Sequence, residues 1–324
     1  MQSLAQIIAR LEGRRPRVLL VGDLVLDRMI FGTIRRISRE APIPVVQCDG
    51  EAAAPGGAAN TAANLASLGA EVHLAGLVGD DLRGRELVTL LKELGAGTDL
   101  ICTRDDQPTT VKTRVLAGGA GTVRQQVARL DEEPKAPPTE ATRQRLFRGL
   151  IEAAADFDVV ALSDYGYGAV DPLLSSQITS APVVVDSRRQ LGRFRGAHTL
   201  KPNLSELEGV AGADLHRRDQ VIAAAQDLCR RADAGAVLVT LGRDGMQLVE
   251  RDALRAVPVF GDDEVADVTG AGDSVLAAYT VALAAGLDRF DAARVATVAG
   301  AVAVSHHGTH AVTIAELRQA LTDA

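Results

Sequence analysis

Tryptophan is absent from this sequence, aromatic residues make up only 3% of it, and there are three cysteines. The cysteines (Cys48, Cys102 and Cys229) are odd in number, and no pair has the spacing of a metal or redox motif. This pattern argues against the disulfide framework of a small secreted protein. We expect reduced cysteines in a cytoplasmic protein.

Long apolar runs are also missing. No segment has the ~18 uninterrupted apolar residues that a membrane-spanning helix needs. Residues 1–17 resemble a short amphipathic helix and lack the apolar core of a signal peptide. The net charge of −7 argues against a nucleic-acid or anionic-membrane surface. We therefore expect neither nucleic acid nor membrane as a partner.

Two common nucleotide-binding fingerprints do not occur. There is no G-x-x-x-x-G-K-[ST], and Gly22-Asp23 follows the first expected strand in place of G-x-G-x-x-G. The first absence argues against a P-loop NTPase. The second argues against a nicotinamide oxidoreductase on a doubly wound sheet.

What the sequence does have is 47% hydrophobic residues, enough for a large core. Short β-branched apolar runs alternate with amphipathic stretches. They predict strands at residues 18–21, 72–78, 159–162, 183–185 and 236–241, and helices at 58–68, 85–94 and 220–231. Continuous apolar strands separated by helices are typical of parallel strands buried on both faces. We expect a single α/β domain over residues 1–324, a doubly wound, mainly parallel sheet flanked by helices.

Two segments interrupt this alternation. Residues 28–55 contain Pro42, Pro44 and Pro55 and have no helical period, and residues 109–131 look like two strands around a Gly-rich turn. Together they predict a small β-sheet lid that moves or becomes ordered when substrate binds. Contact between two such lids predicts a homodimer.

The most specific local feature is the sequence DVTGAGD, which ends at Asp273 and precedes an apolar helix. Gly270, Ala271 and Gly272 are expected to present successive N–H groups at the N-terminus of that helix, a concavity that suits a phosphoryl group. Asp273 is expected to accept the proton of an attacking hydroxyl as a general base. Its alternative role is to cap the helix, but Thr269 and Gly270 already provide a cap and a tight turn.

Four motifs make the chain resemble the ribokinase-like carbohydrate kinases, often called the PfkB family. They are GGAAN at residues 56–60, NLSE at 203–206, TLG at 240–242 and DVTGAGD at 267–273. The resemblance covers essentially the whole chain. It implies ATP-dependent phosphorylation of a hydroxyl group on a small molecule.

Within that family, the chain is most similar to the D-glycero-β-D-manno-heptose 7-phosphate kinases. The similar stretches are GDLVLDRMIFG, RISREAPIPVV, PGGAANTAANLASLGA, PTTVKTRVL, QQVARLD, LSDYGYG and LKPNLSELE. Many of those kinases are the front half of a bifunctional protein, whereas this chain resembles the stand-alone type. The resemblance implies phosphorylation of O1 to the 1,7-bisphosphate, in the synthesis of ADP-heptose for the lipopolysaccharide core. A kinase for another sugar, sugar acid or nucleoside, or a non-catalytic sugar or nucleotide sensor, stays open.

The resemblance also implies roles for individual residues. The sugar would be held by Asp27, Gly56, Gly57, Asn60 and Asp164. The nucleotide would lie along Thr240, Gly242, Gly245, His307 and Gly308. Asn203 and Glu206 would bind Mg²⁺ through water, and their capping-box spacing also predicts a helix cap. Asp267 and Thr269 match positions that hold a monovalent cation, such as K⁺, in several relatives.

Several cations predict that the substrate already carries a phosphate. Lys112 and Arg114 occupy alternate positions of an expected lid strand, so both side chains point to one face. Arg129 follows on the neighbouring lid segment, and Arg188 and Arg189 follow the expected strand at 183–185. The guanidinium fork suits phosphate oxygens. The alternative is that these are solvated surface cations.

One departure from the heptose kinases concerns a further cation. Those kinases commonly carry a Lys shortly after Ser-Asp-Tyr, where this chain has Tyr167. Any phosphate contact made by that Lys is missing here. Lys201, Arg188 or Arg189 would have to compensate.

Three histidines close together, His306, His307 and His310, raise the question of zinc. We identify no acidic or cysteine partner close to them in the sequence, and the resemblance places this segment beside the adenine pocket. The sequence therefore predicts no metal here.

Overall fold

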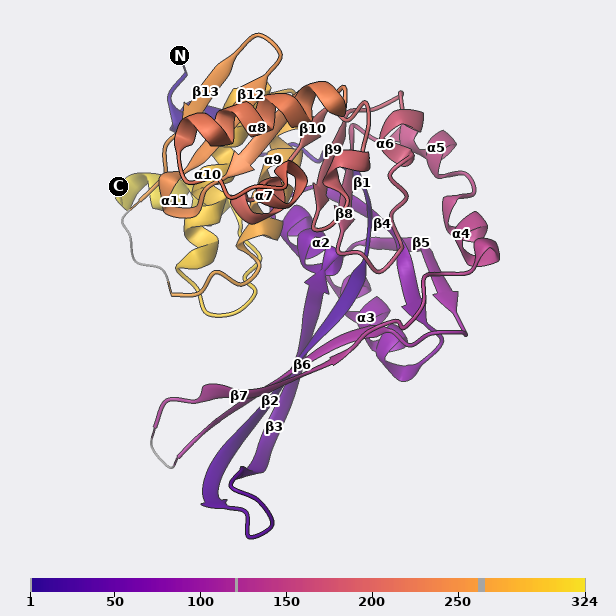
Figure 1. Ribbon diagram of the computed structural model, residues 1–324, viewed down its shortest axis with the longest axis vertical. Coiled ribbons are helices and arrows are strands. Elements are labelled where there is room, and N and C mark those ends of the chain that lie inside the picture. The colour runs from indigo at the N-terminus through magenta and orange to yellow at the C-terminus, as the bar shows by residue number, and fades with distance from the viewer. Residues whose placement is uncertain (1, 120–121, 262–265, 324) are drawn as a thin grey trace.

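The computed structural model describes residues 2–119, 122–261 and 266–323. Among these residues, nine strands form one large sheet in the order β13-β12-β11-β10-β9-β8-β1-β4-β5 (Figure 1). They are β1 (Arg17–Gly22), β4 (Glu71–Gly79), β5 (Gly97–Arg104), β8 (Val159–Asp164), β9 (Val183–Ser187), β10 (Thr199–Leu200), β11 (Ala236–Thr240), β12 (Met246–Glu250) and β13 (Leu254–Val257). The strands from β11 to β5 are parallel, and β12 and β13 add an antiparallel edge.

Helices cover both faces of this sheet. One face carries α1 (Leu4–Ala9), α2 (Ala58–Ser67), α3 (Leu82–Glu93), α9 (Ala271–Ala284), α10 (Arg289–Val304) and α11 (Ile314–Asp323). The other carries α4 (Glu140–Phe147), α5 (Leu150–Ala153), α6 (Leu174–Gln177), α7 (Leu204–Ala211) and α8 (Arg218–Arg231). Short 3₁₀ turns are η1 (Ala154–Asp156), η2 (Leu191–Arg193) and η3 (Gly242–Asp244). Within the described residues, none of these helices combines the length and apolarity needed to cross a bilayer.

The alternating side chains of β1 explain why the sheet has two cores. Val18 and Leu20 pack into the core on one face, and Leu19 and Val21 pack into the core on the other. Successive side chains of a strand point to opposite faces, so a strand buried on both sides must be apolar throughout. The predicted doubly wound, mainly parallel α/β fold is confirmed.

The predicted strands and helices are all present, and only their ends differ. The helix predicted at 85–94 begins earlier, at Leu82, because Asp81 caps it. The Asp81 carboxylate accepts a hydrogen bond of 2.7 Å from the Gly84 amide, and this satisfies an N–H group that the first turn of the helix leaves free.

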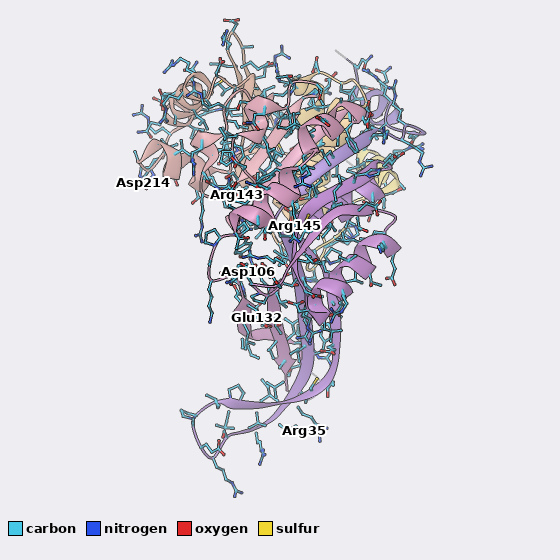
Figure 2. The ribbon with its side chains drawn as sticks, turned by 90° about the vertical axis from the view of Figure 1, so that its right-hand side faces the viewer. Arg35, Asp106, Glu132, Arg143, Arg145 and Asp214 are labelled. Carbon is cyan, nitrogen blue, oxygen red and sulfur yellow. The ribbon has the colours of Figure 1, made fainter. Side chains whose placement is uncertain are left out.

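A second, four-stranded sheet has the order β3-β2-β6-β7, and we call it the protruding sheet because it extends away from the main body (Figure 1). Its strands are β2 (Leu24–Ile37), β3 (Pro44–Gly57), β6 (Thr110–Gly118) and β7 (Gln125–Glu132). Arg35 lies on its far part and Glu132 closer to the body (Figure 2).

The protruding sheet contains the two segments that were expected to form a lid, residues 28–55 and 109–131. Residues 120–121 of the expected Gly-rich turn lie outside the described residues. All eight residues of β7 are exposed. Movement of this sheet and pairing of two copies through it stay predictions.

Candidate active site

A large cavity lies where the parallel strands of the main sheet end. Its volume is about 1380 Å³, and its lining includes Asp164 and Asp186 from the ends of β8 and β9 and Asp273 from the first turn of α9. The carboxyl ends of parallel strands are where open α/β sheets bind their ligands. The sheet topology therefore brings residues more than 100 positions apart in the sequence to one site.

Asp273 is fixed in the cavity by three side chains. Its carboxylate accepts hydrogen bonds from Asn60 Nδ2 (2.8 Å), Tyr165 Oη (2.7 Å) and Thr61 Oγ1 (3.2 Å). Burial raises the pKa of Asp273, and the hydrogen bonds from Asn60 and Tyr165 act in the opposite direction. A carboxylate that is fixed in place and has a raised pKa suits a general base.

The turn before α9 differs in part from the expected row of free amides. Gly270 has φ = 78°, the left-handed conformation that glycine adopts readily. The Ala271 amide donates to Val268 O (3.3 Å) and the Asp273 amide donates to Gly270 O (3.0 Å), so these two are used within the turn. The Gly272 amide has no acceptor among the described residues, and a Cβ at Gly272 would meet no atom within 4 Å. The Gly270 amide has no acceptor among these residues either, so the N–H groups available to a phosphoryl group are those of Gly270 and Gly272.

Tyr165 is a site residue that the sequence did not single out. It lies in the loop after β8, and its hydroxyl donates to Asp273. Burial raises the pKa of Tyr165 well above its ordinary value, and the negative charge of Asp273 adds to this effect. The hydroxyl therefore stays protonated and acts as a donor. The signal that could have pointed to it is the alternation of glycine and tyrosine at residues 165–168, directly after a buried strand.

Asp23 fixes the loop that carries Tyr165. Its carboxylate accepts hydrogen bonds from the backbone amides of Tyr165 (2.8 Å), Tyr167 (3.0 Å) and Ala169 (2.9 Å). Burial raises the pKa of Asp23 to about 6, against the effect of these three bonds. The residue that stands in place of a dinucleotide fingerprint thus has a positioning role.

We predict that Tyr165→Phe moves the acid limb of the pH profile of kcat/KM to higher pH. A base must be ionised, so the rate falls as the pH drops through the pKa of Asp273. Tyr165 donates a hydrogen bond that lowers this pKa, and phenylalanine removes the bond. Tyr167→Phe is the matched control, because the Tyr167 hydroxyl donates to Glu133 (2.5 Å) instead. An acid limb that stays in place or moves to lower pH in Tyr165→Phe would contradict the role given to Tyr165.

The expected sugar-binding residues lie around the junction of the two sheets. Asp27 on β2 forms an ion pair of 2.6 Å with Arg114 on β6. Gly56 lies directly against Asp27, because a Cβ there would be 2.5 Å from its carboxylate. Gly57 precedes α2, which carries Asn60. Their arrangement suits a polyol ligand.

The cations expected to bind phosphate separate into two groups. Arg114 is paired with Asp27, and Arg129 makes two hydrogen bonds, of 2.7 and 2.6 Å, to Asp131. Lys112 and Arg188 have no carboxylate partner among the described residues. Both lie against aromatic rings.

Lys112 Nζ is 6.0 Å from the ring centre of Tyr165 and 5.9 Å from that of Tyr167. The Arg188 guanidinium is 4.1 Å from the ring centre of Tyr165. Burial lowers the pKa of Lys112, and the positive charges of Arg188 and Arg129 lower it further.

Lys201, also proposed to replace the missing lysine, and Asp164, expected to bind the sugar, both make contacts within the protein. Lys201 is buried and forms an ion pair of 2.9 Å with Asp186. Asp164 is also buried, and accepts hydrogen bonds from Ser187 Oγ (2.6 Å) and the Gly166 amide (2.9 Å). These groups shape the cavity through contacts within the protein.

Asn203 and Glu206 form the reciprocal cap of α7. The Asn203 amide donates to Glu206 Oε2 (2.8 Å), and the Glu206 amide donates to Asn203 Oδ1 (2.8 Å). Burial raises the pKa of Glu206, and the nearby charge of Asp186 raises it further. Glu206 and Asp186 are two carboxylates that repel each other and offer oxygen ligands. Such a pair fits a hydrated Mg²⁺. Thr240, Gly242 and Gly245 line the same cavity.

Asp267 connects the turn before α9 with the loop after α10. One carboxylate oxygen accepts from the Thr269 amide (2.9 Å) and hydroxyl (2.7 Å), and the other accepts from the Gly308 amide (3.0 Å). Burial raises the pKa of Asp267, but the hydrogen bonds from Thr269 and Gly308 outweigh it, and with the nearby charge of His307 they lower this pKa below its ordinary value. A monovalent cation at Asp267 and Thr269, and contact of His307 and Gly308 with the nucleotide, stay predictions.

Comparison with known proteins places this site in a family. Residues 18–315 match the pfkB family carbohydrate kinases. The bifunctional protein HldE of Mesorhizobium japonicum is 39% identical over 99% of this chain, and that of Coxiella burnetii strain RSA 493 is 41% identical over 95%. The chain spans 64% of the length of each of these relatives.

Solved structures with a similar fold are also kinases. Phosphofructokinase-2 from Escherichia coli, in complex with potassium, has a TM-score of 0.75 and 22% identity, with 96% of this chain and 99% of that chain covered. Arabidopsis thaliana ribokinase, complexed with ribose and ATP, has a TM-score of 0.72 and 20% identity, with 96% and 98% covered. At these identities, the likeness concerns the fold.

Proposed function

The chain belongs to the PfkB family of carbohydrate kinases, and we propose that it transfers the γ-phosphoryl group of ATP to O1 of D-glycero-β-D-manno-heptose 7-phosphate. Family membership makes it a phosphotransferase that acts on a sugar hydroxyl. What the proposal adds is the substrate, a heptose that already carries a phosphate, and the hydroxyl that accepts the second one.

In the proposed reaction, Asp273 accepts the proton of the O1 hydroxyl as that oxygen attacks the γ-phosphorus, and the bond from phosphorus to the departing ADP oxygen breaks. The Gly272 amide, at the N-terminus of α9, donates to the phosphoryl oxygens as their charge changes. Asn203 and Glu206 would hold Mg²⁺ through water. When bound, the ion supplies positive charge to the phosphate oxygens.

Two cations beside the base carry the substrate assignment. Lys112 and Arg188 both lie against the ring of Tyr165, whose hydroxyl donates to Asp273. Neither has a carboxylate partner in the described part of the chain, and burial together with the charge of Arg188 already lowers the pKa of Lys112. The charges of Asp131 and Asp27 act on the pKa of Lys112 in the opposite direction, but neither forms an ion pair with it. Two cations without an ion-pair partner next to the base suit an acceptor that brings a phosphate.

The relatives support the same substrate. The relatives reported above bear the name HldE, a heptose kinase and adenylyltransferase. The stretches quoted above as similar to heptose 7-phosphate kinases include LSDYGYG, which contains Tyr165, and PTTVKTRVL, which contains Lys112. We place the reaction in the synthesis of ADP-heptose.

A panel of acceptors tests the proposal. We expect ATP turnover with the 7-phosphorylated heptose to exceed that with free heptose, ribose, fructose 6-phosphate and nucleosides, and ³¹P NMR to show the new phosphate on O1. Turnover only with an unphosphorylated sugar or a nucleoside would leave a PfkB kinase and remove the heptose-phosphate assignment.

A further inference from the structure

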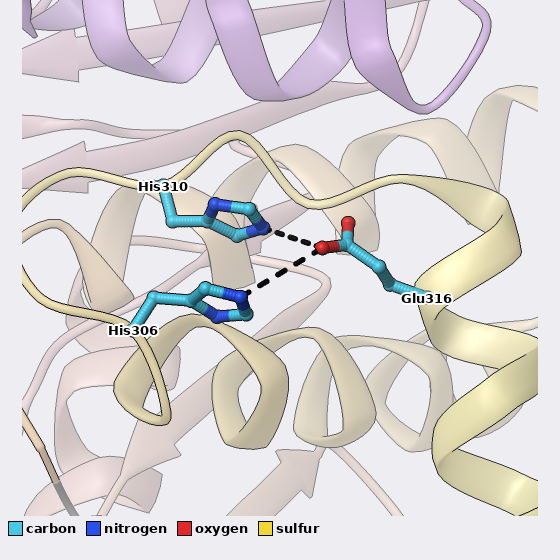
Figure 3. Close-up of side chains that lie close together, drawn as sticks. All are labelled: His306, His310 and Glu316. Carbon is cyan, nitrogen blue, oxygen red and sulfur yellow. Dashed lines mark hydrogen bonds and ion pairs between the residues drawn. The ribbon is translucent and has the colours of Figure 1, made fainter.

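Two histidines and a glutamate converge outside the cavity, where the chain leaves α10 and enters α11 (Figure 3). His310 Nε2 is 2.7 Å from Glu316 Oε1, and His306 Nε2 is 3.9 Å from the same oxygen. One potential ligand atom from each of the three residues lies within 4.8 Å of the other two. We call His306, His310 and Glu316 the His-His-Glu cluster.

The acidic member was missed in the sequence. Glu316 follows His310 by six residues, and the expectation that no acidic partner is close is wrong. The turn at Thr313 brings it back to the histidines, because Glu316 caps the start of α11. Glu316 Oε2 accepts from the Thr313 amide (2.8 Å) and hydroxyl (2.7 Å), which leaves Oε1 directed at the two rings. Such fixed partners orient a metal-binding carboxylate.

The tautomer of His306 can be assigned from its neighbours. His306 Nδ1 is 2.9 Å from the carbonyl oxygen of Val302. A carbonyl only accepts hydrogen bonds, so Nδ1 carries the proton and the Nε2 of the neutral ring has a lone pair. His306 Nε2 and Glu316 Oε1 lie 3.9 Å apart. Both atoms then offer a lone pair to the space between them. A histidine whose Nδ1–H is held by a backbone carbonyl is the usual arrangement of a metal ligand.

The geometry is close to what a metal ion needs. The His306 and His310 rings are stacked, with centres 3.7 Å apart and planes at 3°. Zinc binds imidazole nitrogen and carboxylate oxygen at ~2.0–2.2 Å, so ligand atoms around it lie about 3–3.5 Å apart. The Nε2 atoms and Oε1 need modest shifts, and tilting of the two rings, to reach this. All three side chains are partly exposed, so the shifts are open to them and water can take the fourth position.

We propose that the His-His-Glu cluster binds Zn²⁺ or a similar first-row transition metal ion, with water as the fourth ligand. Two imidazoles and one carboxylate suit zinc, cobalt or nickel, whereas Mg²⁺ prefers ligand sets of oxygen alone. This site is separate from the Mg²⁺ position at Asn203 and Glu206. It rests on contacts of the cluster itself and stands whether or not the sugar substrate is a heptose.

The bound ion would tie the end of α10 to the start of α11. The loop between them carries Gly308, whose amide donates to Asp267 beside the turn before α9. A metal ion would therefore stiffen a loop that contacts the candidate active site. Its direct effect is on the stability of this loop, and no step of phosphoryl transfer passes through the ion.

Zinc titration of the chelator-treated protein, without nucleotide and against a chromophoric chelator, tests the site. We expect one zinc ion per chain, at least ~10-fold weaker binding in His306→Ala, His310→Ala and Glu316→Gln, and a rise in Tm with zinc for the unaltered protein that is smaller in these three variants. Glutamine at position 316 keeps a capping-box residue, so this variant retains the start of α11. Co²⁺ should give the visible absorption of a four-coordinate site.

His307→Ala is the matched control, because it removes a neighbouring imidazole outside the cluster, and it should bind zinc like the unaltered protein. Equal zinc affinity in the unaltered protein and in both His310→Ala and Glu316→Gln would overturn the proposal. So would the absence of saturable zinc binding, which would leave the cluster as a histidine hydrogen-bonded to Glu316.

Discussion

Asp273→Asn is expected to abolish phosphoryl transfer while ATP and the sugar still bind. Asp273 lies in the first turn of α9, beside the free Gly272 amide, where it can take a proton from the acceptor hydroxyl. A positioned base contributes roughly 10²–10⁴-fold to the rate, so kcat should fall by at least ~10²-fold. The measurements are kcat by a coupled ADP assay and Kd for ATP and sugar by calorimetry.

The substitution should leave the fold intact. Asn60 can donate to the new carbonyl oxygen, and the hydroxyls of Tyr165 and Thr61 can rotate to accept from the new amide. Asp214→Asn is the control, because Asp214 is an exposed acidic residue far from the protruding sheet (Figure 2). A folded Asp273→Asn enzyme that keeps a third of the unaltered rate would show that another group is the base.

The second large effect is expected from Lys112 and Arg188. Replacement of either by Met keeps an apolar stem against Tyr165 and removes the charge. A hydrogen bond to a charged group contributes ~1.5–3 kcal/mol, and each 1.4 kcal/mol corresponds to about tenfold. We therefore expect kcat/KM for heptose 7-phosphate to fall at least ~10-fold in each variant and ~10²-fold in the double variant. With free heptose, kcat/KM should change little.

The comparison of two acceptors separates this effect from general damage. Arg124→Met is the matched control, because Arg124 also lies on the hairpin of the protruding sheet but is half-exposed and paired with Asp49. If kcat/KM fell equally with the phosphorylated and the free sugar, Lys112 and Arg188 would have another role. A rise only in the KM of ATP with Arg188→Met would place Arg188 on the nucleotide.

Much of the fold could be predicted because its signals are local. The continuous apolar strand at 18–21 requires burial on both faces, and the prolines and missing helical period at 28–55 indicate a separate sheet. The antiparallel edge of β12 and β13 was not predicted. Both strands are short, and β13 is exposed at three of its four positions, so periodicity gives little signal.

The candidate site could be predicted in part. The DVTGAGD turn gave Asp273 and its place at a helix start, because motif and helix are contiguous in sequence. The number of free amides in the turn was overestimated, because the hydrogen bonds of Ala271 and Asp273 depend on how the turn closes. Tyr165 was missed, because its contact with Asp273 joins residues 108 positions apart.

Charge pairing shows most clearly what the sequence leaves undecided. Lys112, Arg114, Arg129 and Arg188 look alike as cations in a sequence. In the structure, Arg129 pairs with Asp131 two positions along β7, and the register between β2 and β6 places Arg114 against Asp27, so these carboxylates neutralise both arginines. Lys112 and Arg188 meet tyrosine rings instead, so their charge stays available.

The sequence by itself determined the family and the parallel sheet and singled out Asp273 as the candidate base, because each follows from residues next to one another or from a short period. The tertiary structure decided which cations stay unpaired, which hydroxyl holds Asp273, and that Glu316 turns back to His306 and His310. The physical reason is that charges and hydrogen bonds depend on distances of a few ångströms in space. Those distances are set by strand register, caps and turns that bring separate segments together.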